Sequence, residues 1–509
     1  MNISDYLKKN AKNFPQKTAF ICGEQSVTFL DLYISVESLS SMLIKKGVKK
    51  GDQVSVIQNN SIELLYLFYA IANIGAVIIP INGSQNKIDL LKQLKLCDTK
   101  FLFIWHGYLQ DIIEDLNKSK IKKIFTIGEK LTGFENFENL LINTGEFKKR
   151  SLKDNKNNYI FSLTSGSTNK PKIIIFSQET KILRALNAQK LFKLSKNDIL
   201  IIGTPFKQSI TQRIIFLSLI LGSTCVIMQK FTPKNWAQLV TYHNVTFSIL
   251  VSSQIENISE YLKKTKKKLK NLKTLVSCCA QLREDTMKKI LPNLHGKFFD
   301  TYGATEAGTL TKIQVTLKKN NENMGKNTKD SKIIFYNNDT KKFSRIKGEI
   351  CVKTPLIFSG YYKNKKISKN SFINNYFKTG DYGYFKNKNL FLTGRRSDII
   401  ITGGINVYSR DIERVIDKHP DVEQSVVIGV PDKKLGEAVI AVIKTKKKIS
   451  RRKLHIFCAN NLADYQQPFY IDFISKFPTT GGYNKISKIK LKLKYSRFNL
   501  RKKLKDTFS

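Results

Sequence analysis

Short apolar runs alternate with longer segments of helical periodicity through most of the chain. The segment 61–75, "SIELLYLFYAIANIG", repeats its apolar positions every three to four residues, as a buried helix does. Apolar runs of strand length accompany such helices at 53–57, 76–81, 100–105, 122–127, 248–253, 273–277 and 297–303. Strands that alternate with helices usually form a parallel sheet covered by those helices. The pattern therefore predicts an α/β fold.

The pattern changes between residues 345 and 393, where the apolar runs become short and turn residues separate them. The segments 348–355, 360–364 and 383–394 have this character. Short runs bounded by Gly, Asn and Lys are typical of antiparallel hairpins. We therefore expect this region to be built of paired strands without long helices.

A separate α+β unit is predicted after Gly394. Two helical segments, 409–419 and 450–462, each begin at a serine that suits the N-cap position, Ser409 and Ser450. Apolar runs of strand length lie around them at 398–404, 424–432, 437–445 and 470–477. The chain is therefore expected to divide into residues 1–393 and residues 394–509.

Length and composition agree with a globular protein of two domains. The chain has 509 residues, 41% of them hydrophobic, which is enough to bury a large core. Its longest apolar stretches, 70–81 and 214–228, are short or interrupted by polar residues, whereas a membrane-spanning helix needs about 20 apolar residues. The first residues contain no apolar core of the kind that a signal peptide requires. We therefore expect a cytoplasmic protein.

Cysteine and histidine do not point to a zinc site. The seven cysteines and five histidines are dispersed, and no two cysteines have CxxC spacing. Scattered cysteines in a chain without a signal peptide are typical of thiols that are not paired in disulfides.

The net charge of +47 raises the question of an anionic partner. Nucleic acid or an anionic membrane would attract such a chain. Only 13 of the 87 basic residues are arginine, however, and base-specific contacts favour arginine. The sequence is also rich in Asn and Ile, which share AT-rich codons with Lys, so codon bias explains the charge without a partner. A specific nucleic-acid function is not predicted.

One loop carries more chemistry than its neighbours. In "LTSGSTNKPKIII", residues 163–175, hydroxyl residues surround Gly166 and are followed by Lys170 and Lys172. The loop fits either a turn between strands or a phosphate site, because backbone N–H groups, hydroxyls and lysine all bind phosphate oxygens. It does not match the P-loop pattern GxxxxGK[ST]. These residues alone leave both interpretations open.

Further motifs follow this loop in order along the chain. They are "YGATE" (302–306), "GEI" (348–350), "GYY" (360–362), "KTGDYGYF" (378–385), "GRRSDIIITGGINVYSRDIE" (394–413) and "PTTGGYNKIS" (478–487). Together with "LTSGSTNKPK" they resemble the motifs of adenylate-forming (AMP-binding) enzymes, which include the acyl-CoA synthetases, the adenylation domains of peptide synthetases and the luciferases. The resemblance covers nearly the whole chain. It implies a large N-terminal domain of stacked α/β subdomains with a small β-barrel-like part, followed by a small mobile α+β C-terminal domain.

The resemblance implies a site for ATP and Mg²⁺ in the N-terminal domain. The residues that would surround the β- and γ-phosphates are Thr164, Ser165, Gly166, Ser167, Thr168 and Lys172. Tyr302 would stack on adenine, with Asp300 near its amino group. Thr305 would contact the α-phosphate, and Glu306 would hold Mg²⁺, which prefers carboxylate oxygen.

The remaining roles implied by the resemblance fall near or in the C-terminal domain. Asp381 would accept hydrogen bonds from both ribose hydroxyls, since a carboxylate has two acceptor oxygens. Arg395 lies where the family has an arginine that contacts ribose and phosphate. Lys485 would bridge the substrate carboxylate and the α-phosphate as a cation where negative charge accumulates. The turn Gly403-Gly404 would come close to the pantetheine arm of coenzyme A.

Several positions depart from the family pattern. Asn169 and Ile173 replace the two glycines that usually flank the "PK" of the phosphate loop, so the backbone at Ile173 must be extended. Ser397 stands at the hinge, where Asp or Lys is common, and Asn484 precedes Lys485 in place of glycine. The charged set remains complete, so we expect an active enzyme, with reduced or lost activity as the alternative.

The expected reaction is ATP-dependent activation of a carboxylic acid as acyl-adenylate, followed by transfer to coenzyme A. The stretch "TPFKQSIT" (204–211) lacks the aspartate that amino-acid-activating members use to hold an amine. A pocket around Gln208, Cys278 and Cys279 would suit a fatty or other largely apolar acid. An acid–thiol ligase acting in fatty acid metabolism is therefore expected.

Three alternatives remain open. The acyl group could pass to a carrier protein in place of coenzyme A. The protein could be a basic nucleic-acid-binding protein, although it has no known nucleic-acid-binding motif, or an inactive scaffold. A further question concerns residues 485–509, where Ile and Leu alternate with Lys. That segment could lie on an anionic membrane or be a solvated tail.

Overall fold

The chain forms two compact units in the computed structural model, which describes residues 1–142, 155–163, 172–319, 322–338, 340–480 and 485–496, apart from residues 82, 84 and 111. Unit 1 comprises the described residues of 1–332 and 353–375. Unit 2 comprises residues 333–352 and the described residues from 376 onward. The predicted division into the domains 1–393 and 394–509 stays a prediction.

The first sheet of unit 1 is parallel in its middle and antiparallel at its edges. Its strands follow one another in the order β16 (Lys326–Asn327), β15 (Gly308–Gln314), β14 (Lys297–Ala304), β13 (Thr274–Cys278), β12 (Phe247–Val251), β10 (Ile199–Ile202), β11 (Thr224–Ile227), β1 (Thr18–Cys22) and β2 (Gln25–Thr28). Neighbouring strands of the sheet are often not consecutive in the sequence, because helices connect the parallel strands.

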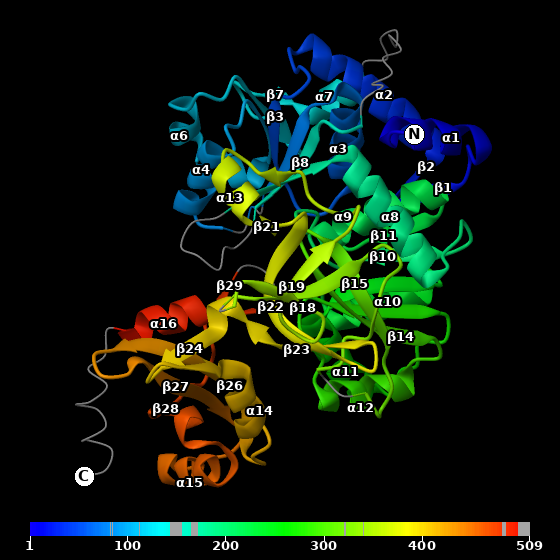
Figure 1. Cartoon of the computed structure of the whole chain (residues 1–509). Coiled ribbons are helices and arrows are strands. Elements are labelled where there is room, and N and C mark those ends of the chain that lie inside the picture. The colour runs from blue at the N-terminus through cyan, green and yellow to red at the C-terminus, as the bar shows by residue number, and fades with distance from the viewer. Residues whose placement is uncertain are drawn as a thin grey trace. The chain divides into compact units, whose positions relative to one another are not determined.

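The second sheet of unit 1 has the order β20 (Gly360–Tyr361), β9 (Ile173–Ser177), β8 (Asn158–Leu163), β4 (Val77–Ile81), β3 (Gln53–Ile57), β5 (Phe101–Trp105), β6 (Lys123–Ile127) and β7 (Glu135–Asn136). It is parallel from β8 to β7, whereas β9 and β20 add antiparallel strands at the other edge. Figure 1 shows these strands in blue and cyan, joined by β20 from the yellow part of the chain.

Helices connect the strands of unit 1. They are α1 (Ile3–Asn13), α2 (Phe29–Lys45), α3 (Ile62–Ile74), α4 (Lys87–Leu96), α5 (His106–Leu109), α6 (Ile113–Asn117), α7 (Phe137–Ile142), α8 (Gln178–Phe192), α9 (Ser209–Leu221), α10 (Pro233–Tyr242), α11 (Ser252–Thr265), α12 (Glu284–Ile290) and α13 (Lys365–Asn370), with a 3-10 turn η1 (Leu291–Asn293). The side chain of Ser61 caps α3, and Gly75 ends it with a φ of 75°. A left-handed residue at a helix end favours glycine, which explains why the helix stops before β4.

Unit 2 contains an antiparallel sheet and a second, mixed sheet. The first runs β18 (Lys342–Ser344), β17 (Lys332–Asn337), β19 (Lys347–Lys353) and β22 (Tyr376–Lys386), with β23 (Asn389–Arg395) beside β22. The second runs β25 (Ile405–Tyr408), β24 (Ile399–Thr402), β27 (Gly436–Thr445) and β26 (Val422–Asp432), with β28 (Tyr470–Phe473) parallel to β27. The helices α14 (Ser409–Ile416), α15 (Arg451–Asn461) and α16 (Lys488–Ser496) pack against the second sheet, and 3-10 turns lie at η2 (Arg396–Asp398) and η3 (Asp464–Gln466).

The structure confirms the predicted α/β fold. Two local predictions, for the segment 360–364 and for Ser409, are wrong. All seven apolar runs are strands of the parallel parts of the sheets. The segment 360–364 does not form a hairpin with its neighbours, because β20 adds to β9. Ser450 caps α15 as expected, whereas Ser409 is the first residue of α14 and its hydroxyl accepts a hydrogen bond from Lys488. Within the described ranges, no helix is long and apolar enough to cross a membrane.

Candidate active site

The hydroxyl-rich loop lies between β8 and β9. These strands are antiparallel, and the last pair before the loop joins Leu163 to Ile173. Ile173 is extended and 4% exposed, as its β-branched side chain requires. The loop residues Thr164, Ser165, Gly166, Ser167 and Thr168 lie outside the described residues, so their phosphate contacts stay predictions.

Lys172, Tyr361 and Glu306 come together although they are far apart in the sequence. The ammonium group of Lys172 lies 5.3 Å from the centroid of the Tyr361 ring, and the Tyr361 hydroxyl donates a hydrogen bond of 2.9 Å to Oε1 of Glu306. Burial, and then the charge of Glu306, raise the pKa of Tyr361. The phenol therefore stays protonated and remains a donor. Residues from three motifs thus form one cluster, in which Tyr361 contacts both Lys172 and Glu306.

Arg184 on α8 holds the turn that carries Thr305 and Glu306, between β14 and β15. Its guanidinium donates to the carbonyl oxygens of Thr305 (2.9 Å), Glu306 (2.8 Å) and Leu356 (2.9 and 2.7 Å). The residue is 2% exposed. Five N–H donors in a rigid planar fork suit this task, which a lysine could not perform. Arg184 therefore fixes the turn on which the predicted Mg²⁺ ligand sits.

Arg184 belongs to a group of three cations that the motifs did not indicate. Lys181, one helical turn before Arg184, is 1% exposed and donates to Oε1 of Gln212 at 2.5 Å. Arg213 on α9 is partly buried and donates to the hydroxyl of Thr309 at 2.6 Å. Burial, followed by the charges of Arg184 and Arg213, lowers the pKa of Lys181 well below its usual value. The sequence signal that could have indicated this group is the pair Lys181 and Arg184, two basic residues three positions apart on the helix that follows the loop.

Asp300 is committed to a partner inside the protein. Its carboxylate is fully buried, and Oδ2 lies 3.1 Å from Nζ of Lys319, whose side chain is 1% exposed. Burial raises the pKa of Asp300, and Lys319 opposes this effect. The predicted contact with the adenine amino group would have to share this carboxylate with Lys319. Tyr302 lies on the same strand, β14, and is 6% exposed. Its stacking on adenine stays a prediction.

Asp381 and Arg395 lie opposite each other on β22 and β23. Nε of Arg395 donates to Oδ1 of Asp381 at 2.7 Å. The Asp381 side chain is 8% exposed and that of Arg395 is 53% exposed. The structure thus brings together two residues predicted at the ribose, and their nucleotide contacts stay predictions.

The predicted glycine turn is a tight hairpin between β24 and β25. Gly403 and Gly404 have φ angles of 56° and 79°. Two consecutive positive φ angles are the mark of a type I′ turn, which glycine adopts without strain. A Cβ atom at either glycine would meet nothing within 4 Å among the described residues. The turn can therefore accept a close approach by another chain, as the prediction for coenzyme A requires.

Lys485 begins β30 (Lys485–Ile486), which pairs antiparallel with β29 (Thr479–Thr480). Thr480 is the direct partner of Lys485. The motif "PTTGGYNKIS" is thus a hairpin in unit 2, and its residues 481–484 lie outside the described residues. Ser397, at the predicted hinge, is exposed in η2.

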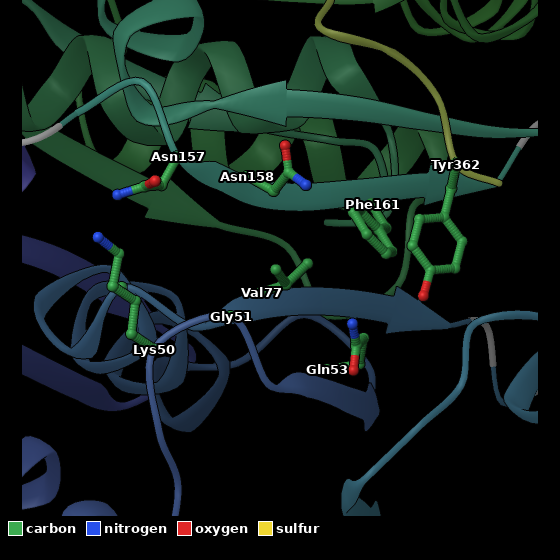
Figure 2. Close-up of a pocket in the computed structure, with 9 residues that line it drawn as sticks. Lys50, Gly51, Gln53, Val77, Asn157, Asn158, Phe161 and Tyr362 are labelled. Atoms are coloured by element: carbon green, nitrogen blue, oxygen red, sulfur yellow. The ribbon is translucent and has the colours of Figure 1, made fainter. Parts of the chain in front are cut away.

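A cavity of about 160 Å³ lies elsewhere in unit 1, beside β3, β4 and β8. Figure 2 shows Lys50 and Asn157 with their polar ends turned toward one another on one side of it, and Phe161 and Tyr362 on the other. None of the predicted site residues lines it. The cavity is therefore not the predicted nucleotide site.

The described residues fit Mg²⁺ with a nucleotide. Mg²⁺ is usually bound by one or two carboxylates together with substrate phosphates. Glu306 supplies such a carboxylate, Arg184 lies within electrostatic reach of it, and Lys172 lies over the ring of Tyr361, which donates to it. Among the residues that the structure describes, no group of three His, Cys, Asp or Glu side chains could hold a metal without a substrate.

Comparisons with known proteins agree with this site. The family model of the AMP-binding enzymes matches residues 7–362, and that of their C-terminal domain matches residues 411–482. A 2-succinylbenzoate–CoA ligase from Listeria monocytogenes is 27% identical over 496 residues, which are 97% of this chain and all of the relative. A second ligase of that name, from Bacillus pumilus, is 28% identical over 97% of this chain and 98% of its own.

Solved structures share the fold. ATP-bound MatB from Rhodopseudomonas palustris has a TM-score of 0.87 at 22% identity and covers 98% of this chain and 99% of its own. The o-succinylbenzoate–CoA synthetase of Bacillus subtilis, in complex with its acyl-adenylate, has a TM-score of 0.84 at 24% identity over 96% of this chain and 97% of its own. The large and small domains predicted from the motifs are those of this fold. The chain belongs to the AMP-binding enzyme family, the adenylate-forming enzymes that include the carboxylate–CoA ligases and use ATP, Mg²⁺ and, in the ligases, coenzyme A.

Proposed function

We propose that the protein is an ATP-dependent carboxylate–CoA ligase. The substrate carboxylate attacks the α-phosphate of ATP and releases pyrophosphate, and the thiol of coenzyme A then takes the acyl group from the adenylate. The observation that carries this proposal is the cluster of Lys172, Tyr361 and Glu306, in which the turn that carries Glu306 is held by Arg184. Glu306 would hold Mg²⁺, which would shield the phosphate charge, and Lys172 would add a second cation for the phosphates.

The acid substrate is the finer part of the proposal. The relatives are named for 2-succinylbenzoate, which has two carboxylates, whereas a fatty or largely apolar acid was expected from the sequence. Arg213 favours a second acidic group. Its Nε makes no hydrogen bond to the described residues, and it lies within electrostatic reach of Cys278 and Cys279 at the predicted acyl pocket. A buried N–H donor without an acceptor is costly, and a carboxylate of the substrate would supply the acceptor. We therefore propose an acid that carries a second carboxylate or similar polar group.

A panel of acids tests both levels of the proposal. Purified protein with ATP and Mg²⁺ is expected to release AMP with 2-succinylbenzoate in a reaction that depends on coenzyme A, and to do so faster than with fatty acids of similar size. Release with no acid of the panel would contradict the ligase function. Faster turnover of fatty acids would support the prediction, made from the sequence, that the substrate is an apolar acid.

Arg213→Met should raise the KM for diacids by about tenfold or more, the scale of one lost hydrogen bond to a charged group. The KM for monocarboxylic acids serves as the internal control and should change little. Equal changes for both classes would mean that Arg213 supports the fold and does not contact the substrate.

The acyl acceptor is proposed to be coenzyme A, with a carrier protein as the alternative. Pyrophosphate exchange measures the first half-reaction without either thiol. Competition between coenzyme A and an acyl carrier protein for the adenylate then separates the acceptors. A basic nucleic-acid-binding protein would bind nucleic acid at physiological salt, and an inactive scaffold would give no exchange at all.

Through α16, contact of the C-terminal segment with anionic membranes is expected to be mainly electrostatic. Leu491 and Tyr495 are fully buried in one cluster with Val426, Ile428 and Tyr470, so these two side chains serve the protein core. Leu493 is 50% exposed. Lysines remain on the other face and would contribute about 1 kcal/mol each near an anionic surface. Sedimentation with anionic vesicles should therefore occur at low salt and disappear near physiological salt. If the protein sedimented with the vesicles even at high salt, apolar side chains would insert into the membrane. If it did not sediment with them at low salt, the segment would be a solvated tail.

A further inference from the structure

Two neighbouring cysteines at the end of β13 bring their sulfur atoms together. Sγ of Cys278 lies 3.5 Å from Sγ of Cys279. Side chains of consecutive residues in a strand point to opposite faces, so this approach is unusual. Cys279 has a φ of 74°, in the left-handed region. That turn of the backbone brings its side chain to the same side as that of Cys278, in a conformation that is sterically strained for a residue with a Cβ.

The pair is reachable from solvent, unlike the other cysteines. Cys279 is exposed and Cys278 is partly buried, with its thiol 3.5 Å from the carbonyl oxygen of Leu250. The remaining cysteines are all buried: Cys22, Cys97, Cys225, Cys351 and Cys458. Reagents in solution therefore meet this pair before any other thiol of the chain.

The surroundings of the pair favour a disulfide over a metal site. Among the described residues, no third metal-ligating side chain joins the two sulfurs, so they would hold a metal ion with two protein ligands at most. A disulfide needs no further ligand. Arg213 lies within electrostatic reach of both sulfurs.

We propose that Cys278 and Cys279 form a vicinal dithiol that low-molecular-weight disulfides oxidise reversibly to a disulfide between the two residues. The Cys279 thiolate attacks one sulfur of the small disulfide, whose S–S bond breaks and releases one thiolate. The Cys278 sulfur, having lost its proton to solvent, then attacks Cys279 sulfur and releases the second thiolate. Two electrons pass to the small disulfide, and the two protons end on the released thiols.

The order of attack follows from the environment of each sulfur. The hydrogen bond with Cys279, and then burial, raise the pKa of the Cys278 thiol well above its usual value. The Cys278 thiol is therefore slow to react with an oxidant, whereas the exposed Cys279 thiol reacts first. The distance of 3.5 Å makes the second attack intramolecular. The first attack converts the Cys279 thiol, which is the largest cause of the raised pKa of Cys278, into a mixed disulfide, so Cys278 then loses its proton more readily.

Thiol counting and mass spectrometry test the oxidation directly. After treatment with oxidised glutathione, five of the seven thiols should remain titratable in denaturant, and the peptide 274–283 should be lighter by two hydrogens. Cys279→Ser should keep its six thiols or carry glutathione on Cys278 alone. Cys458→Ser, which removes a fully buried thiol from unit 2, should still lose two thiols. Phenylarsine oxide, which bridges two thiols, should bind once to the wild type and not to Cys279→Ser.

Three results would overturn the proposal. They are seven titratable thiols after oxidation, a stable glutathione adduct on Cys279 of the wild type, or a disulfide that links two chains on a non-reducing gel. Each would mean that the two sulfurs do not close on one another.

The consequence for activity rests on the proposed function. Because the pair adjoins Arg213 at the predicted acyl pocket, oxidation should lower kcat/KM for the acid by about tenfold, and dithiothreitol should restore it. The two proposals fail in different ways. A protein that closes the disulfide but activates no acid contradicts only the ligase function, and a reduced, active ligase whose pair never closes contradicts only the dithiol.

Discussion

Glu306→Gln is expected to lower adenylate formation by about 10²-fold or more, the scale of removing one preorganised electrostatic contact. Glutamine keeps the size of the side chain and an oxygen that can accept the hydrogen bond of Tyr361. Arg184 binds the backbone oxygen of residue 306, so this support is unchanged. The substitution thus removes the charge that would hold Mg²⁺ while the turn stays in place.

Release of AMP at increasing Mg²⁺ concentration measures this effect, and thermal unfolding shows whether the fold is intact. Tyr361→Phe is the matched control, since it keeps the ring beside Lys172 and removes only the hydroxyl that donates to Glu306. It should cost much less than Glu306→Gln. If Glu306→Gln released AMP at the wild-type rate, Glu306 would have no metal role.

Lys485→Ala should cripple adenylation but leave thioester formation from a supplied acyl-adenylate nearly unchanged. The predicted bridge between the substrate carboxylate and α-phosphate is needed only while the adenylate forms. Lys485 lies in the β29–β30 hairpin of unit 2, whereas Glu306 and Lys172 lie in unit 1. We propose that the small domain, residues 394–509, rotates about the hinge near Ser397 between the two half-reactions. The loss in adenylation should be about 10²-fold or more.

Ser397→Pro should show the opposite pattern, because proline fixes φ and would stiffen the hinge. Gly403→Leu should resemble it, since a large side chain would fill the open turn that coenzyme A is expected to approach. That variant also strains a turn with positive φ, so its unfolding temperature must be compared with the wild type. Lys494→Ala, on the exposed face of α16, is the control and should change neither half-reaction. Equal slowing of both half-reactions by Lys485→Ala would contradict the rotation.

The positions of the motif residues show how far sequence reasoning reaches. "YGATE", "GYY" and the lysine of the phosphate loop are recognisable because a family keeps chemical groups in order along the chain. The structure then places Tyr361 between Lys172 and Glu306, a contact that neither motif states by itself. Arg184 was missed because a buried arginine that binds carbonyl oxygens leaves no pattern except its place on a helix.

The segment 360–364 shows that the pairing partner of a strand could not be predicted from the local sequence. Its residues have strand character, and the neighbouring runs suggested a hairpin within the same region. β20 pairs with β9 instead, nearly two hundred residues away in the sequence. Hydrogen bonds in a sheet depend only on which backbones meet in space, so local composition predicts a strand but not its partner.

The sequence by itself determined the α/β class, the family, and the set of side chains available for ATP, Mg²⁺ and acyl transfer, because these follow from periodicity and from the chemistry of each residue type. Only the tertiary structure decided which of those side chains have partners. It committed Asp300 to Lys319, joined Asp381 to Arg395, and turned Cys279 toward Cys278. The reason is physical: a charge, a hydrogen bond or a thiol acts over a few ångströms, and distances of that size are set by packing and by backbone φ angles, not by spacing along the chain.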